Sequence, residues 1–187
     1  MRLFIAQKLT DQQKKSIEHL QQKLHHHLDG TKWVSPAAMH LTLTFLGEVQ
    51  TDSVPSVIKA MQAAAAGTES FECSYGGGGV FPAPDKAKVI WLGLRSGSEA
   101  VHSLASGLSA ALAEKGFFVE SRSFTPHLTL GRLRYSLALD KIMNFLEETR
   151  SFATVTARIE QIILYMSRLT RQGAVHTAVQ EIKLGRI

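Results

Sequence analysis

Several features that mark other protein classes are scarce in this sequence of 187 residues. Cysteine occurs once, at Cys73, which excludes an internal disulfide and leaves no Cys-x-x-Cys pair for a zinc site. No apolar run is long enough to span a membrane, and the apolar start at residues 2–6 turns polar at Gln7, too early for a signal sequence. We therefore expect a cytoplasmic protein with no membrane partner.

Motifs for metals and nucleotide cofactors are also missing. There is no His-x-Glu pattern and no carboxylate pair at metal-ligand spacing. His25, His26 and His27 are consecutive, but side chains turn by about 100° per helical residue, so three in a row cannot face one ion and indicate a solvated helix end. The glycines at 76–79 lack a following Lys-Ser or Lys-Thr, which predicts a flexible turn. We expect no metal and no other cofactor.

The composition is that of an ordinary globular domain, with 44% hydrophobic and 20% charged residues. Because no Pro- or Ser-rich linker divides the chain, we expect one folding unit over residues 1–187 and a monomer. The net charge of +5 favours a polyanionic partner. Arg122, Arg132 and Arg134 bracket the motif around His127 and could meet a nucleic-acid backbone there.

Apolar periodicity and cap signals predict an α+β fold. The expected helices are 10–28, with Thr10 and Gln13 as a capping box, 53–67, 98–115 with Ser98 as N-cap, and 137–148. The expected strands are 2–6, 39–45, 71–75, 89–94, 124–133, 152–156, 158–167 and 175–184.

One short pattern occurs twice. His40-Leu41-Thr42-Leu43 and His127-Leu128-Thr129-Leu130 lie 87 positions apart, close to half the chain. Alternate residues of a strand share a face, so His40, Thr42 and Thr44 should lie on one side, and His127 and Thr129 likewise in the second copy. The repetition predicts two similar lobes whose central strands lie side by side. Two histidines delivered in this way could carry out acid–base chemistry at a phosphate.

The sequence resembles the two-histidine phosphoesterases, and within them the RNA 2′,3′-cyclic phosphodiesterase family once named 2′-5′ RNA ligase. The matching segments follow one another in the family's order and cover essentially the whole chain; they are 2–6, 39–48, 89–93, 124–132 and 164–169. The chain departs from the family's pattern at Gln7-Lys8, where an apolar residue and Asp are usual, and at His176, where an aromatic is usual.

This resemblance implies a bilobal, pseudo-two-fold fold with two antiparallel-rich sheets facing a central cleft and helices outside. It implies hydrolysis of RNA 2′,3′-cyclic phosphate ends to 2′-phosphates, with a weak reverse 2′-5′ ligation. It assigns His40 as proton donor and His127 as proton acceptor. Thr42 and Thr129 are expected to bind the phosphoryl oxygens, and Arg132 to contact the phosphate or base.

Three alternatives remain open at this point. The same residues could cleave 2′-5′ oligonucleotides or a small cyclic nucleotide, and a panel of substrates would separate these activities. The chain could also be a non-catalytic protein that binds RNA ends. The loss of one histidine would favour that third function, but both histidines are present.

Overall fold

The computed structural model describes residues 1–118, 124–170 and 173–185. The α-helices are α1 (Asp11–Leu24), α2 (Val54–Ala66), α3 (Ser98–Glu114) and α4 (Leu139–Arg150). The strands are β1 (Arg2–Lys8), β2 (Thr31–Trp33), β3 (His40–Glu48), β4 (Phe71–Phe81), β5 (Val89–Ser96), β6 (Leu128–Leu133), β7 (Ala157–Ile159), β8 (Gln161–Thr170) and β9 (Gly173–Lys183). None of the helices in these ranges is long and apolar enough to cross a membrane.

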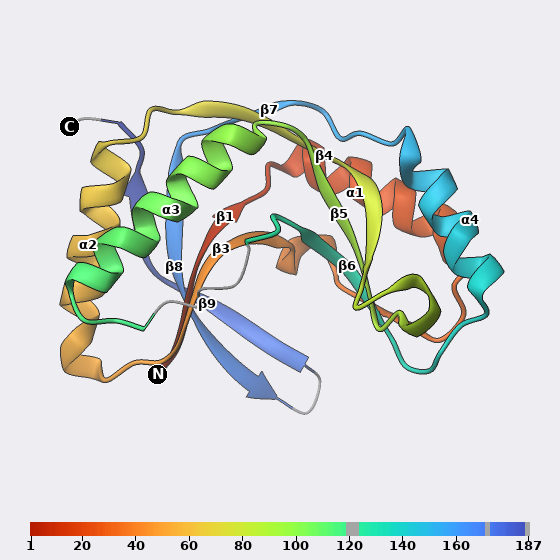
Figure 1. The fold of residues 1–187 in the computed structure, drawn as a ribbon, viewed down its shortest axis with the longest axis horizontal. Helices are drawn as coiled ribbons and strands as arrows, with labels where there is room; N and C mark the ends of the chain where they lie inside the picture. The colour runs from red at the N-terminus through yellow and green to blue at the C-terminus, as the bar shows by residue number, and fades with distance from the viewer. Residues whose placement is uncertain (119–123, 171–172, 186–187) are drawn as a thin grey trace.

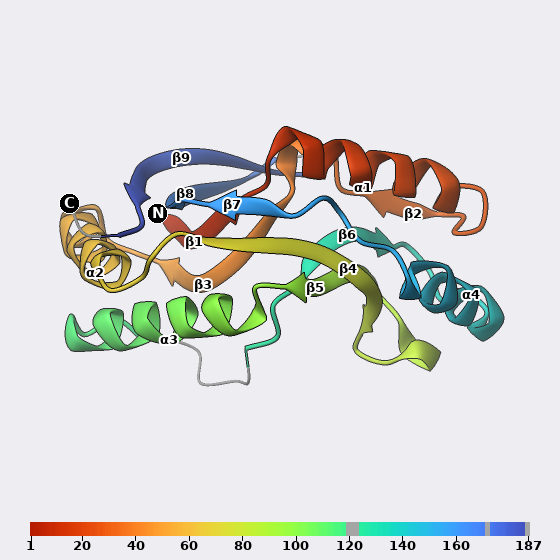
Figure 2. The same cartoon turned by 90° about the horizontal axis from the view of Figure 1, so that it is seen from above.

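The strands form two sheets, with the orders β3-β1-β8-β9 and β2-β6-β5-β4-β7, and every named strand pair is antiparallel. Helices α2 and α3 lie together at one end of the molecule, and α1 and α4 lie at the other (Figures 1 and 2). The sheets meet where β3 contacts β6. The predicted α+β class, with two antiparallel sheets and outer helices, is confirmed.

The two halves of the chain are interleaved in space. The first four-stranded sheet takes β1 and β3 from the N-terminal half and β8 and β9 from the C-terminal half. Helix α1 from the first half packs on the second sheet, because Gln13 Nε2 donates to the Cys73 carbonyl and Gln21 Nε2 to the Leu130 carbonyl. Helix α3 from the second half contacts α2 and β3. Each sheet therefore requires both halves of the chain.

Strand β1 explains where the first motif strand lies. It runs between β3 and β8, and all residues from Leu3 to Gln7 are buried, as a central strand requires. Strand β3 is consequently an edge strand of its sheet, and the prediction of two central motif strands was wrong for the first copy. Strand β3 pairs with β1 along one edge only and also contacts β6 of the second sheet.

Helix α1 begins as the sequence predicts and ends sooner. Thr10 and Gln13 form the predicted capping box, with both reciprocal hydrogen bonds present. The helix stops at Leu24, and the amide of His27 donates to the Leu24 carbonyl in a tighter turn. Histidine is a poor helix former, which accounts for the earlier end at three of them. Leu28 is still buried, so its apolar signal reflects packing beyond the helix.

The glycines at 76–79 lie inside strand β4, so the predicted flexible turn was wrong. A Cβ on Gly78 would overlap Thr149 Oγ1, and one on Gly79 would overlap the Trp91 ring. Glycine is therefore required because α4 packs on one side of the strand and an indole lies across the other. Gly77, at φ +67°, also occurs where the pairing with β5 shifts register.

Four smaller expectations also fail. The short strand β2 was not predicted, and residues 152–156 form no strand apart from an isolated bridge between Ala153 and Gly76. The N-cap of α3 is Gly97, not Ser98, because the chain enters the helix through a left-handed residue at φ +80°. Strand β6 begins at Leu128, after Pro126, which has no amide hydrogen to donate to a ladder. Residues 119–123 lie outside the described ranges.

Candidate active site

His40 is the first residue of β3, and His127 directly precedes β6. In both, Nδ1 meets the backbone carbonyl two residues earlier: Ala38 O lies 2.9 Å from His40 Nδ1, and Thr125 O lies 2.8 Å from His127 Nδ1. A carbonyl oxygen only accepts, so each Nδ1 carries the hydrogen. Both rings therefore keep Nε2 as the nitrogen that takes up or releases a proton.

Thr42 and Thr129 each lie immediately before a β-bulge. In β3, Thr42 pairs with Ala6 but Thr44 pairs with the next residue back, Ile5. In β6, Thr129 pairs with Trp91 while Gly131 pairs with Ile90. The two irregularities are therefore at equivalent positions of the repeat, and the resemblance between the copies extends to the backbone.

The first bulge corrects the prediction for Thr44. Thr44 turns into the core with only 5% of its surface exposed, and Phe45 points outward with 59% exposed. The extra residue in the strand reverses the alternation beyond Leu43, so the two side chains exchange the faces expected from the sequence. His40 and Thr42 precede the bulge, share the open face and are both partly exposed.

Aromatic rings surround each motif histidine. The ring of His40 lies 4.8 Å from Phe4, 5.1 Å from His176 and 6.0 Å from Tyr165, between centroids. The ring of His127 lies 4.9 Å from Phe81 and 6.0 Å from Trp91. The sequence did not predict Phe4, Tyr165, Phe81 and Trp91 as part of the site, and His176 stood out only as a departure from the family's pattern. Their alternation with core residues in β1, β4, β5 and β8 is the signal that could have placed them on the open face.

Burial in this aromatic setting lowers the pKa of His40 to about 4. The hydrogen bond with the Ala38 carbonyl opposes this shift, and the nearby His176 adds to it. His40 is therefore neutral at pH 7 in the unliganded protein. A negative charge brought next to Nε2 would raise this pKa again, since it stabilises the imidazolium.

Arg132 lies on the same face of its sheet as Thr129. Arg132 pairs with Val89 of β5, and Thr129 pairs with Trp91 of the same strand. Val89 and Trp91 are two residues apart and therefore share a face. The side chain of Arg132 is exposed, and Lys32 of β2 pairs opposite it. These two cations could approach an anion bound along β6. Arg134 is also exposed, whereas Arg122 lies outside the described residues.

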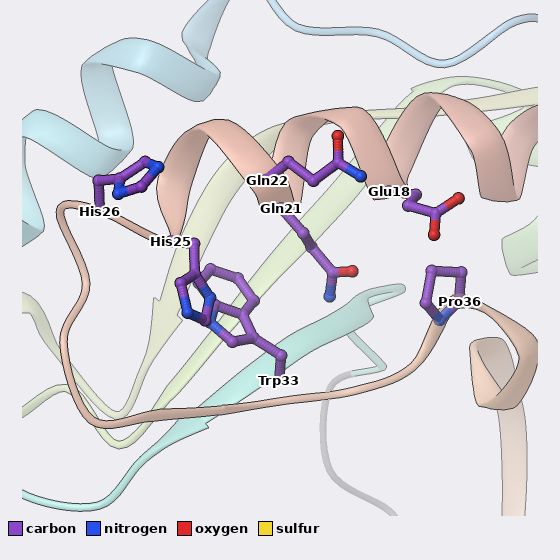
Figure 3. A pocket seen from close by; sticks show the side chains of 7 residues that line it. All are labelled: Glu18, Gln21, Gln22, His25, His26, Trp33 and Pro36. Carbon is purple, nitrogen blue, oxygen red and sulfur yellow. The ribbon is translucent and has the colours of Figure 1, made fainter.

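A separate cavity of about 550 Å³ lies between α1 and β2 (Figure 3). Its walls include Trp33 and His25, whose ring centroids are 6.2 Å apart. Gln21 lines it as well, but its amide is occupied by hydrogen bonds to the Val34 and Leu130 carbonyls. The three consecutive histidines are all exposed past the end of α1, as expected for a solvated helix end. Within the described ranges, no cluster of His, Cys, Asp and Glu side chains could hold a metal ion.

Comparison with known proteins identifies the class. The chain belongs to the LigT-like phosphoesterase family, whose sequence profile matches residues 8–91 and again residues 92–176. The RNA 2′,3′-cyclic phosphodiesterase of Thermotoga maritima is 31% identical over 181 residues, or 97% of this chain and 94% of that protein. The enzyme of the same name from Methanothermobacter thermautotrophicus is 29% identical over 184 residues, with 98% and 99% covered.

Solved structures share the fold. A crystal structure of a protein from Thermus thermophilus superposes with a TM-score of 0.83 at 26% identity and covers all of both chains. Escherichia coli LigT in complex with 3′-AMP gives a TM-score of 0.77 at 24% identity, over 98% of this chain and 97% of that one. The family resemblance inferred from the paired motifs is confirmed.

Proposed function

We propose that this protein hydrolyses the 2′,3′-cyclic phosphate at the end of an RNA strand, leaving a 2′-phosphate and a free 3′-hydroxyl. The observation that carries the proposal is the pair of His-x-Thr segments with matching ring anchors and matching bulges. The relatives named RNA 2′,3′-cyclic phosphodiesterase support the substrate, because they align over nearly the whole chain.

The reaction requires two proton transfers on opposite sides of the phosphorus. Nε2 of His127 takes a proton from water, and the water oxygen forms a bond to phosphorus. The bond between phosphorus and the 3′-oxygen breaks, and Nε2 of His40 gives its proton to that oxygen. Each such acid–base group typically contributes about 10²- to 10⁴-fold in rate.

His40 must be protonated to act as the acid, although burial holds its pKa near 4 in the unliganded protein. The cyclic phosphodiester is an anion, and its arrival beside Nε2 raises the pKa of the ring. Binding of the substrate and protonation of His40 are therefore coupled. This coupling keeps the assignment of His40 as donor compatible with its partly buried position.

The threonine hydroxyls and Arg132 are proposed to bind the phosphate. Thr42 and Thr129 lie two residues beyond the histidines on the same open faces, and are partly exposed. Their hydroxyls can donate to the non-bridging oxygens, where negative charge grows in the transition state. Arg132 adds a positive charge further along β6.

We further propose that the chain acts as a monomeric cytoplasmic enzyme on RNA, and that it folds as one domain. The interleaved sheets support the single domain, since neither half of the chain supplies a complete sheet. A weak 2′-5′ ligation is expected where the 5′-hydroxyl of a second RNA strand replaces water: its oxygen bonds to phosphorus, the bond to the 3′-oxygen breaks, and His127 and His40 move the same two protons. Activity on 2′-5′ oligonucleotides or small cyclic nucleotides remains the second candidate, as the same groups would serve.

The test is an assay that resolves the products of a short RNA with a 2′,3′-cyclic phosphate end. We expect a 2′-phosphate product, an unchanged rate with EDTA, and slower cleavage of a 2′-5′-linked control. Exclusive formation of a 3′-phosphate would contradict the assigned leaving group. Activity lost with EDTA and restored by a divalent metal would contradict the mechanism. Tight binding of the RNA end without turnover would indicate the non-catalytic alternative.

A further inference from the structure

A third imidazole lies against the ring of His40. His176 is on β9 opposite Ser167 of β8 and is partly exposed. The ring centroids of Phe4, His40 and His176 form a triangle with sides of 4.8, 4.9 and 5.1 Å. The plane of His176 is nearly perpendicular to both of the others, at 86° to His40 and 81° to Phe4.

These contacts restrict the ring of His40 from three directions. The Ala38 carbonyl fixes its Nδ1, Phe4 lies along its face, and His176 closes a further side. A catalytic ring that had one of these supports removed could rotate about its side-chain bonds. A rotation would move Nε2 away from the leaving oxygen, and proton transfer depends on that distance.

His176 is also poorly suited to carry charge at this position. Its Nδ1 is buried and has no hydrogen-bond partner among the described residues, so a protonated ring would bury an unpaired N–H group. Burial accordingly lowers the pKa of His176.

The titratable groups on the neighbouring strands do not compensate for that cost. His40 of β3 contacts it directly, Tyr165 of β8 contacts His40, and Lys8 on β1 pairs with His40. Glu181 lies further along β9, and its charge acts on Tyr165. No acidic side chain of the described residues forms an ion pair with His176.

We propose that His176 is a positioning residue for His40. It supports the ring of His40 from one side, and it disfavours a state in which both rings are protonated. Two imidazoles 5.1 Å apart accept one proton more readily than two, because the second charge meets the first. A bound phosphate anion then directs the single proton to His40, whose Nε2 it approaches. This inference extends the function proposed above, since it assigns a third residue to the same proton transfer.

The first measurement needs no substrate. The titration of His40 is followed by NMR of the ring carbons in histidine-labelled protein, with its signal identified by comparison with His40→Asn. His176→Phe keeps a ring at the position and removes the second charge, so the midpoint of His40 should rise by about 0.5 to 1 pH unit. His176→Ala also admits water, and the midpoint should move further toward about 6.5. Thr177→Val, an exposed change on the same strand, is the matched control and should leave it unchanged.

The second measurement is turnover of the cyclic-phosphate RNA as a function of pH. His176→Ala should lower kcat by about tenfold with KM within about twofold, since it releases a ring that acts in the chemical step. His176→Phe should restore kcat to within about threefold of the wild type. An identical His40 midpoint in the wild type and both variants would overturn the proposal, as would full kcat in His176→Ala. If no RNA is cleaved at all, the proposed function fails, while the NMR midpoints still decide the role of His176.

Discussion

Thr42 and Thr129 stand at the same point of two β-bulges, 87 positions apart in the chain. In each strand the histidine two residues earlier is tied by Nδ1 to a carbonyl, and the residue two positions later pairs out of simple register. A bulge bends its strand and raises the local twist. The two strands therefore present an imidazole and a hydroxyl from equivalent curved segments. In a straight strand these two groups would lie in one flat row.

The histidines should matter for turnover and little for folding. We expect His40→Ala and His127→Ala each to lower kcat by about 10² or more, because each removes one proton-transfer group. Single-turnover kinetics on the cyclic-phosphate RNA would measure the loss, with circular dichroism as the check on folding. The double variant should lose less than the product of the two, since the residues act as a unit. Near-normal turnover in either single variant would remove that residue from the mechanism.

The threonine hydroxyls allow a comparison within one strand. Thr42→Val and Thr129→Val should lower kcat/KM by a factor that corresponds to about 1 to 3 kcal/mol of activation free energy, because a donor to the phosphoryl oxygens is lost. Thr44→Val is the matched control: its hydroxyl is buried without a partner in the described structure and points away from the site. This control should leave kcat/KM unchanged and keep or raise stability. Equal kcat/KM in all three variants and the wild type would reduce the motif threonines to strand packing.

The sequence predicted the paired motifs, the fold class and most helices, because alternation and cap signals are local. It could not predict the two bulges, which arise from pairing with β1 and β5 far along the chain. For this reason Thr44 was assigned to the wrong face. The cluster of Phe4, Tyr165 and His176 around His40 was missed for the same reason, since these residues come from three separate strands.

Stability should depend on pH through His40. Burial holds its folded pKa near 4, below about 6.5 in the unfolded chain, so below pH 6.5 the unfolded state takes up the proton first. The stability that neutral His40 contributes is thus complete above pH 6.5 and is lost as pH falls through 4. Urea unfolding at pH 7 and pH 4 should show the wild type losing up to about 3 kcal/mol more than His40→Asn. His19→Asn, an exposed change on α1, should behave as the wild type, and equal losses in all three proteins would contradict the burial of His40.

The glycines of β4 should resist substitution. A Cβ at Gly79 would overlap the Trp91 ring, which itself lies beside His127. Gly79→Ala should therefore lower the free energy of unfolding by about 1 to 3 kcal/mol and reduce kcat, as the indole is displaced toward the histidine. Gly67→Ala is the control, because its nearest neighbour would be 3.8 Å away, and it should change stability by no more than about 0.5 kcal/mol. Unchanged melting and kcat in Gly79→Ala would show that the strand can move aside.

Arg132 should bind substrate through its charge. It is exposed on the open face of β6 and lies two residues past the bulge at Leu130, so Arg132→Ala should raise KM with a smaller effect on kcat. Each phosphate contact contributes to the salt dependence of RNA affinity, and its loss should reduce the slope of log K against log salt by about 0.7 for a single strand. Lys59→Ala, a change on α2 at the other end of the molecule, is the control for net charge (Figure 1). If Lys59→Ala and Arg132→Ala weaken RNA binding equally, the effect belongs to the overall charge of +5 and Arg132 has no place in the site.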